Sequence, residues 1–199
     1  MKLIGFYNYT VILTYMSLIS GVLGMKFAAD GRLGLSICCL VFSGICDMFD
    51  GAVARTKKDR TADEKNFGIQ LDSLSDVVCF GVEPAVFLYF SGVRSTLGVA
   101  AIVFLVLCAV IRLAFFNVLE MNRQKSEDGC AKSFRGLPVT SAAIIFPFFY
   151  LLGLVLPGNI MHVIHHVLPI LTGFLFIADF RVPKFDVTKF IHKLTNKHT

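Results

Sequence analysis

Apolar residues fill six long stretches of the chain, and short polar segments separate them. Each stretch approaches the roughly 20 apolar residues that a helix needs to cross the hydrocarbon core of a bilayer. The composition agrees, because 55% of the 199 residues are hydrophobic and only 17% are charged. The pattern predicts an all-α integral membrane protein, one domain over residues 1–199, with six transmembrane helices at about 6–24, 33–53, 70–90, 97–119, 137–156 and 162–179.

The distribution of lysine and arginine predicts how these helices are oriented. Cations gather after the second and fourth stretches and in the tail at 181–199, whereas the opposite side holds only Lys26, Arg32 and Arg94. Because positively charged short loops stay on the cytoplasmic side, we expect both termini and the basic tail in the cytoplasm. The net charge of +5 does not indicate nucleic-acid binding. The cations lie in juxtamembrane loops without a soluble reading module, so anionic membrane lipid is their expected partner.

Four aspartates interrupt the apolar pattern at the ends of the second and third stretches. Asp47 and Asp50 are three residues apart, and Asp72 and Asp76 are four apart, so each pair shares one helix face. A charge inside a bilayer segment costs at least about 2.5 kcal/mol, so four acids close together need a compensating positive charge. Two such faces that meet would form an all-oxygen cage, for which a metal ion is the natural occupant.

The acids belong to a longer spaced pattern, which reads Asp47-x2-Asp50-Gly51-x2-Ala54-Arg55-x12-Gly68-x3-Asp72-x3-Asp76. This pattern resembles the signature of the CDP-alcohol phosphotransferase family, and every signature position is filled. The resemblance implies a six-helix membrane enzyme that transfers a phosphatidyl group from a CDP-linked lipid to an alcohol and releases CMP. It also implies a divalent-metal site and a homodimer.

The chemistry of that reaction suggests a role for each acid. Asp47, Asp50 and Asp72 are expected to hold one Mg²⁺ or Mn²⁺ ion, and Asp72 and Asp76 to share a second. Two ions can orient a pyrophosphate and neutralise charge on the attacking and leaving oxygens. The attacking hydroxyl must also lose its proton, and Asp76 is the predicted catalytic base.

The same resemblance assigns the nucleotide site. In the family pattern the small residues Gly51, Ala54 and Gly68 line the pocket of the CDP-linked lipid together with Arg55. Small side chains let a nucleotide come close to the backbone. An arginine can contact phosphate oxygens through two parallel hydrogen bonds.

Three further segments resemble the phosphatidylserine synthase branch of the family: Phe80-Gly81-Val82-Glu83-Pro84-Ala85, Arg112-Leu113-Ala114-x-Phe116-Asn117 and Phe134-Arg135-Gly136-Leu137-Pro138. Serine is a zwitterion, so Arg112 and Arg135 are candidates to bind its carboxylate, and Asn117 to orient it. Structural alternatives stay open for all three. They are an ion pair of Arg112 with an acid such as Glu83, a positive-inside role for Arg135, and an interhelical hydrogen bond for Asn117.

The expected function is therefore metal-dependent transfer of a phosphatidyl group from CDP-diacylglycerol to L-serine, at the cytoplasmic face of a cell or inner membrane. One alternative acceptor is glycerol 3-phosphate or inositol phosphate, which would favour a denser basic pocket. A divalent-cation transporter is a second alternative, because acids in a helical bundle can also line an ion path. A purely structural scaffold is the third, and it predicts that Asp72 and Asp76 can be replaced without loss of function.

Overall fold

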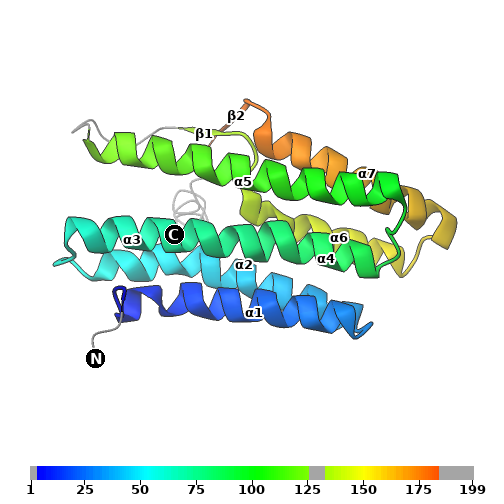
Figure 1. Ribbon diagram of the computed structural model, residues 1–199, viewed down its shortest axis with the longest axis horizontal. Coiled ribbons are helices and arrows are strands. Elements are labelled where there is room, and N and C mark those ends of the chain that lie inside the picture. The colour runs from blue at the N-terminus through cyan, green and yellow to red at the C-terminus, as the bar shows by residue number, and fades with distance from the viewer. Residues whose placement is uncertain (1–3, 126–132, 184–199) are drawn as a thin grey trace, which may run out of the picture.

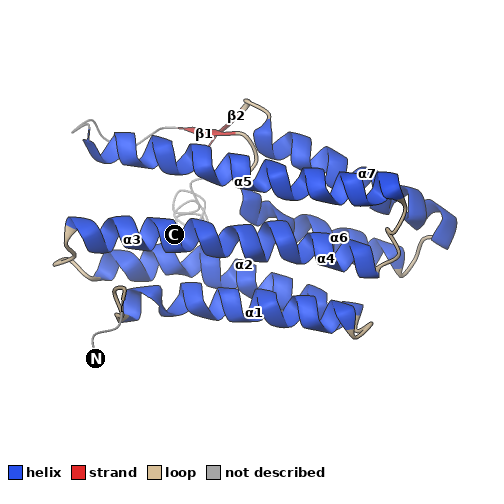
Figure 2. Ribbon diagram, in the orientation of Figure 1, coloured by secondary structure: helices blue, strands red, loops and turns tan. Residues whose placement is uncertain are grey.

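The computed structural model describes residues 4–125 and 133–183 as a bundle of helices that lie side by side along one direction (Figures 1 and 2). The elements in chain order are a 3-10 turn η1 (Tyr9–Val11), α1 (Ile12–Ala29), α2 (Leu33–Thr56), α3 (Ala62–Asp76), a π-helix η2 (Val77–Val82), α4 (Glu83–Phe90), α5 (Thr96–Lys125), β1 (Ser133–Arg135), a 3-10 turn η3 (Val139–Ser141), α6 (Ala142–Gly153), α7 (Gly158–Ile177) and β2 (Arg181–Pro183). The two short strands pair antiparallel, with Arg135 opposite Arg181.

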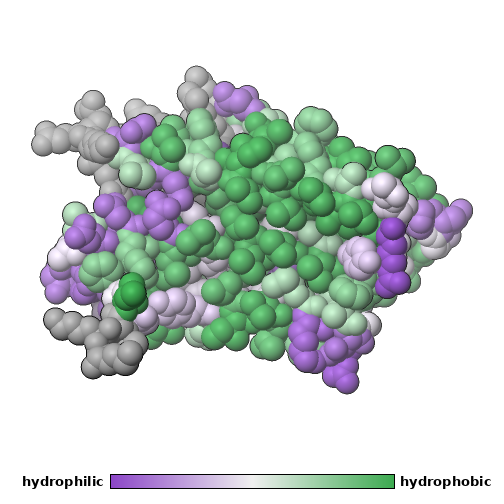
Figure 3. Space-filling model, in the orientation of Figure 1, coloured by the Kyte–Doolittle hydropathy of each residue, from purple (hydrophilic) through white to green (hydrophobic). Residues whose placement is uncertain are grey.

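Membrane-length helices make up most of the described chain. Apolar side chains cover the middle of the face seen in Figure 3, and polar residues gather toward its ends. The helical segments that are long and apolar enough to span a bilayer are, among the described residues, Tyr9–Ala29, Leu33–Thr56, Ala62–Phe90, Thr96–Asn122 and Gly158–Ile177. This confirms the all-helical membrane architecture for five of the six expected spans.

The expected span at 137–156 is represented by a shorter apolar helix over Val139–Gly153. The chain reaches it through Gly136, which has a positive φ of 71° and where a Cβ would lie only 2.8 Å from the carbonyl oxygen of Ala178. Only glycine adopts this conformation readily at such a close approach. The turn uses residues that the hydropathy pattern had counted as helical. A sixth span and the cytoplasmic location of the termini stay predictions.

Small and hydroxyl-bearing residues allow α1 and α2 to pack closely as an antiparallel pair. The Ser17 hydroxyl donates to the carbonyl oxygen of Ser43 at 3.3 Å, and the Ser43 hydroxyl donates to that of Ser17 at 2.9 Å. Ser20 donates to the carbonyl oxygen of Cys39 at 2.9 Å. Such contacts are typical of helix pairs in membranes, where small side chains bring the backbones together. They fix the rotation of α2 and so the direction of its two aspartates.

The third long helix changes its winding directly after Asp76. The π-helix η2 separates α3 from α4, and the backbone N–H of Glu83 bonds the carbonyl oxygen of Val78, five residues earlier. Pro84 follows at the start of α4 and has no N–H to continue an α-helical ladder. Short π segments often adjoin functional sites. Here the wide turn sets the rotation of every residue that follows Asp76.

That rotation buries Glu83 completely, against α1 and α2. Its carboxylate lies against Gly24 and near the Cβ of Cys39, in space that a side chain at Gly24 would fill. Neither carboxylate oxygen has a hydrogen-bond partner among the described residues. Gly24 therefore makes room for Glu83.

We expect Gly24→Ala to lower the free energy of unfolding by about 1–3 kcal/mol, because the added methyl overlaps a carboxylate that is enclosed on all sides. The melting temperature in detergent measures this change. Gly158→Ala is the matched control, since a Cβ there meets nothing within 4 Å. Equal melting temperatures for the two variants would contradict the packing described here.

Candidate metal and nucleotide site

Three of the four aspartates meet where α2 and α3 approach each other. Asp47, Asp50 and Asp72 each offer one carboxylate oxygen, and these oxygens lie within 4.8 Å of one another. Asp76 lies one helical turn beyond Asp72, is only 7% exposed and interacts electrostatically with Asp47 and Asp72. The structure thus brings all four acids into one group. The three that meet are the set that the sequence predicts for a first metal ion.

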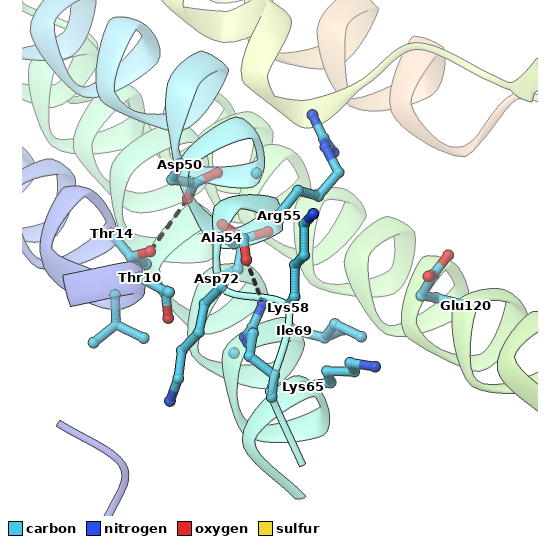
Figure 4. A pocket seen from close by; sticks show the side chains of 15 residues that line it. Thr10, Thr14, Asp50, Ala54, Arg55, Lys58, Lys65, Ile69, Asp72 and Glu120 are labelled. Carbon is cyan, nitrogen blue, oxygen red and sulfur yellow. Dashed lines mark hydrogen bonds between the residues drawn. The ribbon is translucent and has the colours of Figure 1, made fainter. Parts of the chain in front are cut away.

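The helix α1 supports this group from the side. The Thr14 hydroxyl donates to Oδ2 of Asp50 at 3.2 Å (Figure 4). The Ser75 hydroxyl donates to the backbone carbonyl oxygen of Thr14 at 3.4 Å, which ties α3 to α1 at the same level. Thr14 is not among the candidate residues that the sequence indicated. A hydroxyl within an apolar span was the available signal, but nothing in the sequence identified its partner.

The donor set fits a hard divalent cation. All the ligand atoms are carboxylate oxygens, the type that Mg²⁺ and Mn²⁺ prefer. Among the described residues, no ion pair joins any of the four acids to a lysine or arginine. Carboxylates crowded in this way repel one another, so a cation between them would stabilise the arrangement.

A cavity of about 470 Å³ opens beside the acids. Asp50 and Asp72 line it, and Glu120 of α5 lies across it (Figure 4). All four residues expected at the nucleotide also line this cavity: Gly51, Ala54, Arg55 and Gly68. Four more cations surround them: Lys57, Lys58, Arg60 and Lys65. The arrangement can accept a polyanionic ligand whose phosphates reach the acids only through a bridging metal ion.

The loop between α2 and α3 carries much of this positive charge, and Glu64 anchors it. Lys57 forms a 2.9 Å ion pair with Oε1 of Glu64, and this hydrogen bond raises the pKa of Lys57 above its ordinary value. The same oxygen accepts from Asn8 at 3.4 Å, and Oε2 accepts from the backbone N–H of Thr61 at 3.0 Å. Thr61 and Glu64 form a capping box that starts α3. The N-terminal segment, the loop and α3 are thus joined at one carboxylate.

Asn117 connects α5 to α3. Its Oδ1 accepts from the Ser73 hydroxyl at 2.7 Å, and its Nδ2 donates to Oε1 of Gln70 at 3.2 Å. These contacts match the interhelical alternative for Asn117. The backbone of Arg135 lies in β1, and its side chain falls outside the part of the chain that the structure describes.

Arg112 lies in a different environment from the one expected. It is 9% exposed, its Nε donates to the carbonyl oxygen of Leu137 at 3.5 Å, and Asp179 acts on it electrostatically. The two charged residues line a second cavity of about 240 Å³ whose other walls are mostly apolar. Of the two alternatives that the sequence left open for Arg112, the ion pair with Glu83 does not form, because the Glu83 carboxylate lies against Gly24 and has no hydrogen-bond partner among the described residues.

The sequence profile of the CDP-alcohol phosphatidyltransferase family matches residues 7–175. The chain belongs to this family. It is 34% identical over 179 residues to the CDP-diacylglycerol–serine O-phosphatidyltransferase of Methanocaldococcus jannaschii, a match that covers 90% of this chain and 75% of that protein. No solved structure matches the chain significantly.

Two further relatives of this chain have names that also refer to serine. The archaetidylserine synthase of Methanothermobacter thermautotrophicus is 35% identical over 153 residues, which cover 76% of this chain and 61% of that protein. The CDP-diacylglycerol–serine O-phosphatidyltransferase of Helicobacter pylori is 31% identical over 193 residues, which cover 94% and 77%. The chain therefore matches between about three fifths and three quarters of the length of these relatives.

In this family member we expect Thr14→Val to weaken Mn²⁺ binding about tenfold, because the carboxylate of Asp50 loses the hydroxyl that orients it. The affinity for Mn²⁺ is measured by titrating the protein in detergent with Mn²⁺ and monitoring the free ion by electron paramagnetic resonance. Thr14→Ser keeps the hydroxyl and should bind Mn²⁺ nearly as tightly as the wild type. An unchanged affinity in Thr14→Val would show that Thr14 does not position the acid.

Proposed function

We propose that this protein transfers the phosphatidyl group of a CDP-linked glycerolipid to the hydroxyl of L-serine and releases CMP. The observation that carries the proposal is the shared cavity, in which Asp50 and Asp72 adjoin Gly51, Ala54, Arg55 and Gly68. The names of the relatives support serine as the acceptor, because serine is common to archaetidylserine synthase and to the CDP-diacylglycerol enzymes. The lipid part of the names differs, so ester- and ether-linked donors both remain substrates to test.

In this mechanism Asp47, Asp50 and Asp72 would hold one divalent ion, and Asp72 and Asp76 would hold a second. Bound Mg²⁺ or Mn²⁺ supplies positive charge for the pyrophosphate oxygens and for the charge that develops during transfer. Arg55 binds the nucleotide phosphates from the cavity wall. Gly51, Ala54 and Gly68 let the nucleotide lie close to the helix backbones.

Asp76 accepts the proton of the attacking hydroxyl. The serine oxygen forms a bond to the lipid-linked phosphorus, and the bond from that phosphorus to the CMP oxygen breaks with its electron pair leaving on CMP. Asp76 is suited to this role because it is buried beside the acid group and lies one turn deeper than Asp72. A single displacement of this kind requires no covalent enzyme intermediate.

The second cavity supports a zwitterionic acceptor, because Arg112 can bind a carboxylate and Asp179 can bind an ammonium group. Two contacts between α5 and the continuous helical segment formed by α3, η2 and α4 indicate how deep this second cavity lies in the bundle. They are the Asn117 hydrogen bond described above and the close approach of Ala109 to Gly81, where a Cβ would lie 3.2 Å from that of Ala109. Arg112 falls between them on α5, at nearly the depth of Asp76.

The basic loop between α2 and α3 supports a cytoplasmic location for this site, because positively charged short loops stay on that side. CMP and serine are soluble in the cytoplasm, while the donor lipid reaches the site from the membrane. Arg135 remains a further candidate for anion binding near the acceptor, and Asn117 positions the helices around it. We propose a homodimer as the functional state.

The central test is formation of the serine lipid from labelled L-serine and CDP-lipid in detergent, with Mn²⁺ or Mg²⁺ present. We expect Asp76→Asn to reduce turnover by at least about 100-fold, because both the proposed base and a metal ligand are altered. Removal of the metal with a chelator should abolish turnover reversibly. Asp30→Asn changes an exposed acid at the other end of α1, paired with Lys26, and should retain activity.

Three results of that assay would overturn the proposal in different ways. Product formation with glycerol 3-phosphate or inositol phosphate, but not with serine, would identify another acceptor. Metal flux in liposomes without CMP release would indicate the transporter alternative. Full turnover in Asp76→Asn would rule out the proposed chemistry.

The acceptor cavity gives a separate prediction. We expect Arg112→Lys and Asp179→Asn each to raise the KM for serine about tenfold, because the first removes the planar two-bond contact to the carboxylate and the second removes the negative charge that faces the ammonium group. The KM for the CDP-lipid should stay within about twofold of the wild-type value. Steady-state kinetics with each substrate varied in turn distinguishes the two effects, and equal changes in both KM values would contradict a serine-specific role.

A further inference from the structure

Arg60, in the loop between α2 and α3, reaches back into the nucleotide cavity. Its Nη1 donates to the backbone carbonyl oxygen of Ala54 at 3.4 Å, the bond drawn at Ala54 in Figure 4, and its Nη2 donates to that of Glu64 at 3.2 Å. A Cβ on Gly68 would lie only 2.6 Å from Nη2. The guanidinium therefore lies beside Gly68 at the border of the cavity, and it touches two signature positions at once.

The position of this contact indicates which part of a nucleotide Arg60 would meet. Ala54 follows Asp50 by four residues and Gly68 precedes Asp72 by four, so both lie about 6 Å along their helices from the acids. The two helices run in opposite directions, and both steps therefore lead the same way, toward the loop. With the pyrophosphate held at the acids, the nucleoside is the part that extends this far.

The N–H groups of Arg60 that bond no backbone carbonyl match cytosine better than uracil. A guanidinium has five N–H groups in a rigid plane, and the two bonds to backbone carbonyls use two of them. Its Nε is buried and has no hydrogen-bond partner among the described residues, an unfavourable state that an added acceptor would relieve. Cytosine presents two adjacent acceptors, O2 and N3, whereas N3 of uracil carries a hydrogen.

The neighbouring cations are less suited to this role. Lys57 already pairs with Glu64, and a lysine ammonium lacks the planar fork that contacts two adjacent acceptors. Arg60 is also the cation that contacts both Ala54 and Gly68. Its contribution is therefore directional, beyond the positive charge that it shares with the rest of the cavity rim.

We propose that Arg60 is a specificity-determining residue that recognises the cytosine base through its guanidinium fork. The inference rests on the proposed function and adds the group that selects cytidine nucleotides. Arg60 lies outside the spaced signature and was not among the residues that the sequence analysis selected.

The test compares the binding of CMP and UMP to the full chain in detergent with Mg²⁺ present, by titration calorimetry. The wild type should prefer CMP by about 10- to 100-fold, the discrimination expected of a two-bond contact to a base edge. Arg60→Lys should reduce this preference at least about fivefold while CMP still binds. Arg94→Lys, the same exchange at the opposite end of the bundle, should leave the preference unchanged, and melting temperatures verify that each variant is folded.

The outcomes separate this inference from the proposed function. An unchanged CMP preference in Arg60→Lys overturns the role of Arg60, and so does an equal loss of affinity for both nucleotides, which would indicate charge attraction alone. In either case serine-lipid synthesis by the wild type would leave the proposed function intact. A wild type that binds neither nucleotide and forms no serine lipid overturns both.

Discussion

Electrostatic repulsion among four clustered carboxylates is the constraint on which the structure of this protein depends. The ligand oxygens of Asp47, Asp50 and Asp72 lie within 4.8 Å of one another, and at an effective dielectric constant near 20 two unit charges at that separation repel by about 3 kcal/mol. The helices therefore need packing strong enough to hold the acids together until a cation arrives. The interlocked serines of α1 and α2 and the bond from Thr14 to Asp50 supply that rigidity beside the site. A more loosely packed helix pair would move apart and lose the cage.

The same constraint explains where the protein places its positive charge. A lysine paired directly with these acids would neutralise them and occupy the position of a metal ion. The cations instead lie around the cavity, and among the described residues none forms an ion pair with the four acids. Glu64 holds the loop by binding Lys57, so this charge stays near the cavity entrance. The separation leaves the acids open to a cation and places the positive charge where an anionic ligand in the cavity would meet it.

Local helix geometry predicted which acids share a helix face, whereas the resemblance to the family supplied the residues that line the cavity beside them. Spacings of three and four residues place Asp47 with Asp50 and Asp72 with Asp76 whatever the rest of the fold does. Contacts between distant segments were not predictable in this way. The partners of Thr14, Arg60 and Glu64 depend on how helices rotate and how a loop folds back. Hydropathy likewise counted apolar residues near Gly136 as helix, although the chain turns there.

The ion pair of Arg112 with Glu83, one of two alternatives that the sequence left open, does not form, and this shows how a small backbone change redistributes charged groups. Charge complementarity alone favoured the pair, but the π-helix after Asp76 rotates the following residues toward α1 and α2. Glu83 is then enclosed beside Gly24, and Arg112 lies instead with Asp179 in a second cavity. The irregular winding of a few residues therefore decides which charged groups lie together, and charge complementarity in the sequence alone does not.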